Sequence, residues 1–189
     1  MIDKVLLPLR FDATRLHAEV LSFPEEDWIP HFNTPYYSGD WSAIPLRSVD
    51  GDPKRIFPDP TGKGIYQDTA HLLRCSYIHN AVSSLECEKI DVRLLRLKAG
   101  SSIKEHRDYD LAFEDGEVRL HIPVMTNPAL EFYLNKELVT MREGECWYLN
   151  FNLPHSVSNR GTTDRVHLVV DCKINEWLSE LFASATTVV

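Results

Sequence analysis

The sequence reads Lys104-Glu105-His106-Arg107-Asp108-Tyr109 and, farther along, Leu153-Pro154-His155, then Asp164-Arg165-Val166-His167-Leu168-Val169-Val170-Asp171. Two imidazoles and one carboxylate, in the order His-x-Asp followed by a distant His, are the ligand set typical of a mononuclear non-haem iron(II) site. Side chains two residues apart in an extended segment point to the same side, so His106 and Asp108 can bind one ion. His155 follows 49 residues after His106 (155 − 106 = 49), which leaves room for several strands to cross a sheet and return.

A His-x-Asp pair is a weak signal by itself, because a surface His and Asp that bind nothing are common. Pro154-His155 adds weight: this His follows an aromatic strand-like run, residues 146–151, and the proline before it stiffens the backbone. Arg165 then begins an apolar strand ten residues later (165 − 155 = 10). Arginine recognises a carboxylate with two parallel hydrogen bonds, which suggests an anionic co-substrate. A surface salt bridge is the alternative for Arg165.

The segment Val118-Arg119-Leu120-His121-Ile122-Pro123-Val124 alternates between apolar and polar residues. A period of two places the four aliphatic residues on one face of a strand and Arg119 with His121 on the other. A cationic Arg on an inward face is costly unless an anion or a metal is near. The alternative is an ordinary exposed face of an antiparallel sheet. His167 shares the strand face of Arg165, and it either lines a pocket or bonds the backbone in the core.

Taken together, these motifs resemble the aspartyl/asparaginyl β-hydroxylase family of Fe(II)- and 2-oxoglutarate-dependent dioxygenases, and most of all its proline cis-4-hydroxylase-like branch. The resemblance is carried by residues 106–109, 118–121, 144–149, 153–156 and 165–171. It covers residues 90–172 well and the first 90 residues poorly.

The resemblance implies a double-stranded β-helix in which His106, Asp108 and His155 hold iron. It also implies that Arg165 pairs with the distal carboxylate of 2-oxoglutarate. Arg119 and His121 would help to seat the metal-proximal end of that co-substrate. Some members of the family lack the carboxylate ligand; Asp108 is present here, so the full ligand set is expected.

Length and composition exclude several other classes of protein. A chain of 189 residues is one domain of comfortable size, and a formal charge of −8 argues against general nucleic-acid binding. Without a run of 18 apolar residues or a signal-peptide pattern, the sequence predicts no membrane span and a cytoplasmic protein. The four cysteines, at positions 75, 87, 146 and 172, form no CxxC pair, so we expect free thiols in a reducing compartment.

The expected fold class is mainly β: a cupin-like jelly roll with flanking helices in the N-terminal half and at the C-terminus. We expect one domain over 1–189, divided into N-terminal helices, loops and supporting strands (1–88), the jelly-roll core (89–173) and a C-terminal helix (174–189). The predicted strands are 1–10, 42–49, 92–97, 118–125, 131–134, 138–142, 146–151 and 166–172. The predicted helices are one capped by Asp12, one over 69–85 that breaks near Ser76, and one over 174–185. Pro45 favours a sheet edge.

The predicted function is hydroxylation of an amino acid, or of an aspartyl or asparaginyl residue, with iron(II), 2-oxoglutarate and O2. Oxidative decarboxylation of 2-oxoglutarate would yield succinate and CO2. A non-catalytic jelly-roll module that binds a metal or a small acid is the alternative. We expect Tyr36–Trp41 and the Asp50–Gly64 loop to cover the mouth beside His106. Four residues are the candidates for substrate contact: Tyr36, Trp41, Arg107 and Tyr109. A small enclosed mouth favours a free amino acid, and an open groove favours a peptide.

Overall fold

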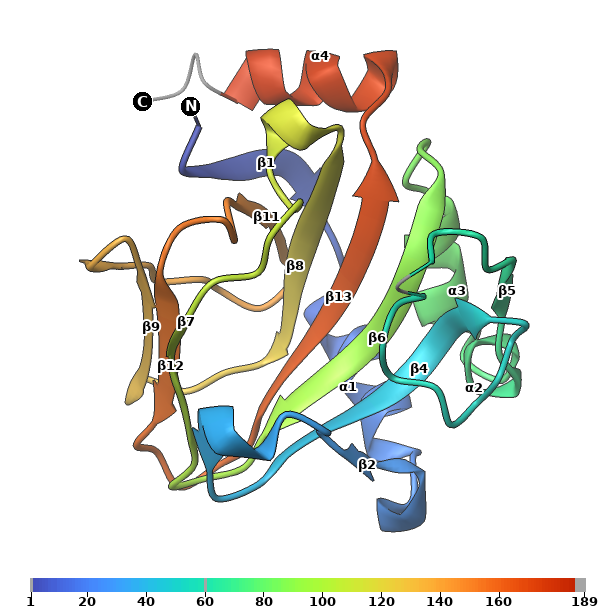
Figure 1. The fold of residues 1–189 in the computed structure, drawn as a ribbon. Coiled ribbons are helices and arrows are strands. Elements are labelled where there is room, and N and C mark those ends of the chain that lie inside the picture. Colours follow the sequence, from blue (N-terminus) through green and yellow to red (C-terminus); the bar gives the residue numbers. More distant parts are fainter. Residues whose placement is uncertain (1, 60, 186–189) are drawn as a thin grey trace.

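Two antiparallel sheets face each other in the computed structural model, which describes residues 2–59 and 61–185 (Figure 1). The predictions for Met1, for Pro60 within the Asp50–Gly64 loop and for residues 186–189 lie outside the described residues. The larger sheet has the strand order β1-β11-β8-β13-β6-β4-β2, with β5 also paired to β4, and the smaller has the order β10-β9-β12-β7-β3. This architecture confirms the mainly β, jelly-roll prediction.

The strands of the larger sheet are β1 (Lys4–Arg10), β2 (Ile29–Pro30), β4 (Trp41–Val49), β5 (Tyr66–Asp68), β6 (Lys89–Leu97), β8 (Glu117–Met125), β11 (Glu145–Leu149) and β13 (Arg165–Lys173). Those of the smaller sheet are β3 (Tyr37–Ser38), β7 (Ser102–His106), β9 (Leu130–Leu134), β10 (Glu137–Leu138) and β12 (His155–Asn159). The helices are α1 (Ala13–Leu21), α2 (Ala70–Leu73), α3 (Ser76–Ser83) and α4 (Glu176–Ala185), with short 3-10 turns η1 (Glu25–Asp27), η2 (Thr34–Tyr36) and η3 (Phe113–Asp115).

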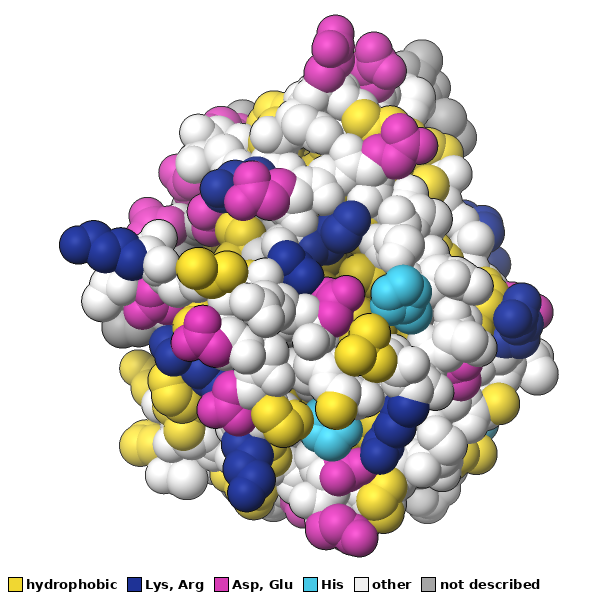
Figure 2. Space-filling model, turned by 90° about the vertical axis from the view of Figure 1, so that its right-hand side faces the viewer, with side chains coloured by type: hydrophobic (Ala, Val, Ile, Leu, Met, Phe, Trp, Pro, Cys, Tyr) yellow, Lys and Arg dark blue, Asp and Glu magenta, His cyan; other side chains and the backbone are white. Residues whose placement is uncertain are grey.

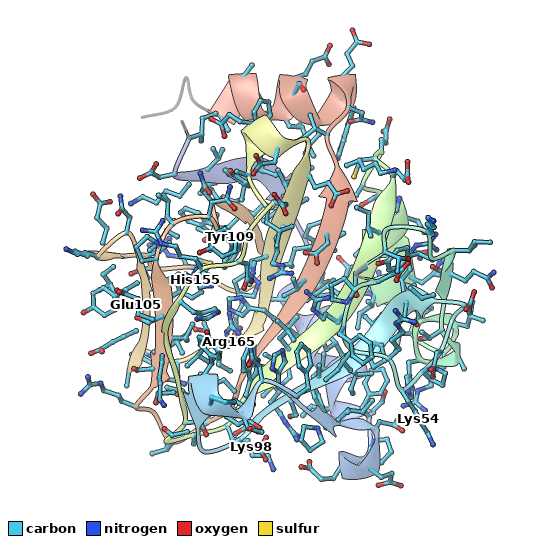
Figure 3. All side chains as sticks on the ribbon, viewed as in Figure 1. Lys54, Lys98, Glu105, Tyr109, His155 and Arg165 are labelled. Atoms are coloured by element: carbon cyan, nitrogen blue, oxygen red, sulfur yellow. The ribbon has the colours of Figure 1, made fainter. Side chains whose placement is uncertain are left out.

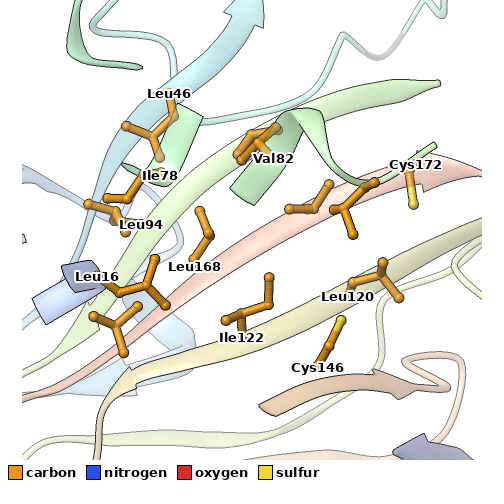
Figure 4. Packing of buried hydrophobic residues seen from close by; sticks show 14 of the residues in the cluster. Leu16, Leu46, Ile78, Val82, Leu94, Leu120, Ile122, Cys146, Leu168 and Cys172 are labelled. Carbon is orange, nitrogen blue, oxygen red and sulfur yellow. The ribbon is translucent and has the colours of Figure 1, made fainter. Parts of the chain in front are cut away.

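The outer face of the larger sheet forms the main hydrophobic core with the helices. Val118, Leu120, Ile122 and Val124 of β8 are fully buried there, which confirms the predicted alternation. Figure 4 shows Leu120 and Ile122 in one cluster with side chains from α1 and α3. Because successive side chains of a strand point to opposite faces, the polar residues of β8 and β13 are left facing the smaller sheet.

Helix boundaries follow local capping. The side chain of Asp12 accepts a hydrogen bond from the backbone N–H of Arg15, so α1 begins where the sequence predicts. The predicted helix over 69–85 is indeed interrupted, and Thr69 caps its first part, α2. In the C-terminal helix α4, the Asn175 side chain accepts from the N–H of Leu178.

Two strand predictions need correction, and strand β12 was missed. The strand predicted over 138–142 is wrong, because β10 ends at Leu138 and Val139 turns inward to pack in the core of the smaller sheet. Strand β12 was not predicted, since its sequence, with two Ser and one Asn in five residues, gives a weak apolar signal. Pro45 was predicted to lie at a sheet edge, and this is true only of the short stretch of β4 around Pro45. Strand β4 is flanked on one side by β6 and on the other by β2 and β5, and Pro45 falls in the gap between those two short strands.

All four cysteines are free, as predicted, and all four are buried. Within residues 2–59 and 61–185, the structure contains no helix long and apolar enough to cross a membrane.

Candidate metal centre

The two predicted histidine ligands are brought together by strand pairing. His106 is the last residue of β7, His155 is the first residue of β12, and the two are direct partners in the antiparallel register. Their ring centroids lie 4.2 Å apart. Asp108 follows two residues beyond β7, where its backbone N–H donates to the carbonyl of Phe151 at 3.0 Å. Ligand atoms from the three side chains all lie within 4.8 Å of one another.

Backbone carbonyls select the same tautomer for both histidines. His106 Nδ1 lies 2.8 Å from the Lys104 carbonyl oxygen, and His155 Nδ1 lies 3.0 Å from the Leu153 carbonyl oxygen. A carbonyl only accepts, so each Nδ1 carries the proton and each Nε2 keeps its lone pair. This is the arrangement found for metal-binding histidines, whose second nitrogen donates to an oxygen that fixes the ring.

The protonation states complete a donor set for a divalent metal. Burial, and then the charge of His106, lower the pKa of His155 to about 4, so its imidazole is neutral at pH 7. Burial would raise the pKa of Asp108, but Arg119, His155 and His106 hold it below its usual range. Two imidazoles and one carboxylate, with all three ligand atoms close together, are a donor set that fits iron(II).

Arg165 lies across the cavity from these ligands. It begins β13 on the larger sheet, whereas His155 begins β12 on the smaller one, and both lie between the two sheets in Figure 3. The Arg165 side chain is buried, and burial lowers its pKa to about 9. Its Nη2 donates to His167 Nδ1 at 2.8 Å. Among residues 2–59 and 61–185 no carboxylate lies within ion-pair distance of Arg165, so the surface-salt-bridge alternative does not apply.

His167 and His121 are both buried beside Arg165. Burial, and then the charge of Arg165, lower the pKa of each well below its usual value, so both rings are neutral. His121 Nδ1 lies 3.1 Å from the same His167 Nδ1 that accepts from Arg165. His167 therefore contacts side chains rather than the backbone, and it holds the guanidinium in place. His121 lines the cavity and stacks on Phe151 with ring centroids 5.0 Å apart.

Arg119 faces inward, as the alternation of β8 predicts, but it already has anionic partners. Its Nη1 donates to Asp108 Oδ2 at 2.6 Å. Its Nε and Nη2 donate to the two oxygens of Asp171 at 2.7 and 2.9 Å. Arg119, which the resemblance assigns to binding of the co-substrate, is thus already paired with two carboxylates of the chain itself.

One cavity of about 400 Å³ contains every predicted site residue. The ligand residues, Arg165, Arg119 and His121 line it together with the four predicted substrate residues Tyr36, Trp41, Arg107 and Tyr109. The ring of Tyr36 lies 5.7 Å from that of His106. The long loop contributes Ile56 and Pro58 to the wall. On the face drawn in Figure 2, side chains of both charges and histidines are interspersed with hydrophobic ones.

Two titratable residues of the cavity wall, His31 and Arg93, were not identified from the sequence. His31 is stacked between Trp41 and Phe32, at centroid distances of 3.5 and 4.6 Å, and burial lowers its pKa to about 4. No spacing signal marks it. Arg93 forms buried ion pairs with Asp91 at 2.7 Å and Asp171 at 3.1 Å. Charged residues at alternate positions of the otherwise apolar strand β6 were the signal that could have identified Arg93.

The chain is similar to known proteins of one family. A family model described as aspartyl/asparaginyl beta-hydroxylase matches residues 11–174. The L-proline cis-4-hydroxylase of Rhizobium meliloti (strain 1021) is 28% identical over 166 residues, covering 86% of this chain and 58% of that protein. An L-proline cis-3-hydroxylase of a Streptomyces species is 26% identical over 196 residues, covering 98% of this chain and 66% of that protein. The chain thus spans less than two thirds of either relative.

Among solved structures, an oxidoreductase of the 2OG-Fe(II) oxygenase family from Burkholderia pseudomallei superposes with a TM-score of 0.57. The match covers 90% of this chain and 85% of the other at 14% identity, and it supports the fold.

Proposed function

The chain belongs to the aspartyl/asparaginyl beta-hydroxylase family, and on this basis we propose that it is an iron(II)- and 2-oxoglutarate-dependent hydroxylase of a small free amino acid. One observation carries the proposal. A buried arginine without a carboxylate partner among the described residues, Arg165, lines the same cavity as a His-Asp-His cluster with both Nε2 lone pairs free. An isolated buried cation is costly, and a dicarboxylate co-substrate would neutralise it.

The residues divide into two groups of roles. His106, Asp108 and His155 would hold iron(II), and backbone carbonyls already set the tautomers of the two histidines. Iron(II) at this position would supply the activation of O2 that couples decarboxylation of 2-oxoglutarate, to succinate and CO2, with insertion of one oxygen atom into a C–H bond. Arg165 would bind the distal carboxylate of 2-oxoglutarate with its planar guanidinium, and His167 would keep that guanidinium aimed into the cavity.

The cavity supports a small substrate. Its volume of about 400 Å³ lies near the lower end of the range for small-molecule sites. Tyr36, Trp41 and Ile56 form apolar walls beside the ligand cluster, and such walls exclude water and orient a compact ring or aliphatic chain. The two relatives carry names that specify L-proline as their substrate. A free amino acid of about that size is therefore the proposed substrate class.

The test is a screen of free amino acids and short peptides with the purified chain. We expect one free amino acid to gain the mass of one oxygen, with succinate formed in equal amount, only when Fe(II) and 2-oxoglutarate are both present. Succinate formation that does not require Fe(II) would overturn the reaction assignment. Oxygenation of peptides but of no free amino acid would overturn the substrate class and leave the chemistry standing.

A further inference from the structure

Arg119 bridges two carboxylates, Asp171 and Asp108, in the space between the two sheets. It is the register partner of Asp171, because β8 and β13 pair directly at these residues. Asp171 accepts from Nε and Nη2 of this guanidinium, and the remaining nitrogen, Nη1, reaches Asp108 Oδ2 at 2.6 Å. All three guanidinium nitrogens of Arg119 are therefore engaged. Two donate to Asp171, and the third donates to Asp108 in the cavity wall.

The two oxygens of Asp108 have different surroundings. Oδ2 accepts from Arg119, whereas Oδ1 lies 3.9 Å from His106 Nε2, on the side of the histidine cluster. The hydrogen bond to Oδ2 fixes the plane of the carboxylate and leaves Oδ1, which has no hydrogen-bond donor from Arg119, turned toward the histidines. Asp108 lies beyond the end of β7, where one backbone hydrogen bond to Phe151 holds the main chain, and the contact with Arg119 orients the side chain.

We propose that Arg119, anchored by Asp171, is a positioning residue that orients Asp108 toward the metal. The inference rests on the proposed function, in which Asp108 is a ligand. It differs from the role that the family resemblance implies for Arg119, which is to seat the co-substrate. Ligating carboxylates are commonly held by hydrogen-bond donors outside the metal's own ligands, and such donors influence metal affinity.

Asp171 acts as the anchor. It is buried and accepts from both Arg119 and Arg93, whose Nη2 lies 3.1 Å away. Asp91 is also a buried carboxylate of this network, but among residues 2–59 and 61–185 its ion pair is with Arg93 and not with Arg119. The chain therefore offers a matched control: Asp171→Asn removes the anchor of Arg119, and Asp91→Asn removes a buried carboxylate that does not hold it.

Charge and orientation must be separated, because a cation beside a metal also repels it. Arg119→Lys keeps the positive charge but replaces a rigid three-nitrogen fork with a single ammonium, which cannot hold Asp171 and Asp108 in the same geometry. A loss of metal affinity in this variant reports orientation rather than charge.

The experiment titrates the metal-free chain with Co(II) in the absence of 2-oxoglutarate and records the visible Co(II) absorption bands, whose intensity reports ligand geometry. We expect Arg119→Lys and Asp171→Asn to weaken Co(II) binding roughly 10- to 100-fold and to alter the bands. Asp91→Asn should bind Co(II) as the wild type does. Thermal unfolding of each variant shows that the comparison is made on folded protein, and Arg119→Lys carries the test if Asp171→Asn does not fold.

Three results would overturn the inference. Arg119→Lys could bind Co(II) with wild-type affinity and bands but require more 2-oxoglutarate, which would return Arg119 to the co-substrate. Asp91→Asn could weaken Co(II) binding as much as Asp171→Asn, which would make the effect a general one of the network. A wild-type chain that binds no Co(II) would overturn the proposed function as well, so the two failures are distinguishable.

Discussion

The guanidinium of Arg165 donates to His167 Nδ1 at 2.8 Å, and no carboxylate of the described residues lies within ion-pair distance of it. The other inward-facing arginines of the larger sheet, Arg93 and Arg119, each contact two aspartates. Of the inward-facing arginines that the structure describes on this sheet, Arg165 is thus the one left for an anion from outside, and it lies on the sheet opposite the histidine cluster.

Arg165→Met should stabilise the folded chain and impair co-substrate binding at once. The change removes a buried charge without an ion-pair partner and keeps the side-chain volume, and His121 can still donate to His167. We expect a gain of roughly 0.5–2 kcal/mol, the range common for single stabilising substitutions. The apparent requirement for 2-oxoglutarate should rise by orders of magnitude, since losing one member of a buried ion pair costs about 3–5 kcal/mol. Denaturant unfolding and a 2-oxoglutarate titration of succinate formation measure the two effects.

Arg93→Met is the matched control for that change. The same substitution here leaves Asp91 without its ion-pair partner and takes one from Asp171, so it should destabilise the chain. If both variants shifted stability in the same direction, Arg165 would have a partner that this account overlooks.

His106→Ala, Asp108→Ala and His155→Ala should each weaken Fe(II) binding and abolish turnover while the fold stays intact. Each removes one of the three donors whose atoms cluster within 4.8 Å, and none contributes to the main core. Fe(II) binding and 2-oxoglutarate decarboxylation without substrate measure the effect, with circular dichroism for the fold. His79→Ala, at a partly exposed histidine outside the cavity, should change neither. Wild-type decarboxylation by His155→Ala would show that the ligand assignment is wrong.

Tyr36→Ala should raise the KM for the amino-acid substrate and leave substrate-free decarboxylation of 2-oxoglutarate unchanged. Tyr36 lines the cavity with its ring against His106, so its loss opens the wall on the substrate side. Tyr133→Ala is the control, because Tyr133 is similarly exposed but lies outside the cavity. An equal rise in KM for both variants would count against Tyr36 as a substrate contact.

The free energy of unfolding should fall as the pH is lowered from about 6.5 to about 4. Burial lowers the pKa of His31 and His155 to about 4, and lowers those of His121 and His167 further. In this window the unfolded chain binds protons on these histidines that the folded chain does not, so stability rises with pH. Burial raises the pKa of Asp91 and of Glu117, which act in the opposite sense but are fewer.

Urea unfolding of the metal-free chain across this window checks the sign, and His31→Gln should make the dependence shallower. A stability that stayed level or rose toward pH 4 would contradict the assignment of neutral buried histidines.

Much of the site could be predicted from sequence because its signals are local. A period of two sets which face of β8 carries Arg119, and the His-x-Asp spacing places two ligands at one strand end. The partners of Arg119 could not be predicted in this way. They depend on the register between β8 and β13, which opposes Arg119 to Asp171, and on the path of the chain beyond β7.

Tertiary placement also explains the other misses. His31 enters the cavity wall because Trp41 stacks on it, a contact that no sequence period encodes. Strand β12 exists because β7 and β9 flank it, and its own sequence, His-Ser-Val-Ser-Asn, has a single aliphatic residue. Pairing on both sides overrides that weak propensity.

The most direct test of the central claim is anaerobic titration of the Fe(II)-loaded chain with 2-oxoglutarate, followed by visible absorption. Chelation of the metal by the keto acid should produce a saturable charge-transfer band in the wild type. The band should be absent in His155→Ala and should require far more 2-oxoglutarate in Arg165→Met. A folded wild-type chain that binds Fe(II) but shows no band at any 2-oxoglutarate concentration would contradict the claim that these residues form a 2-oxoglutarate-dependent iron site.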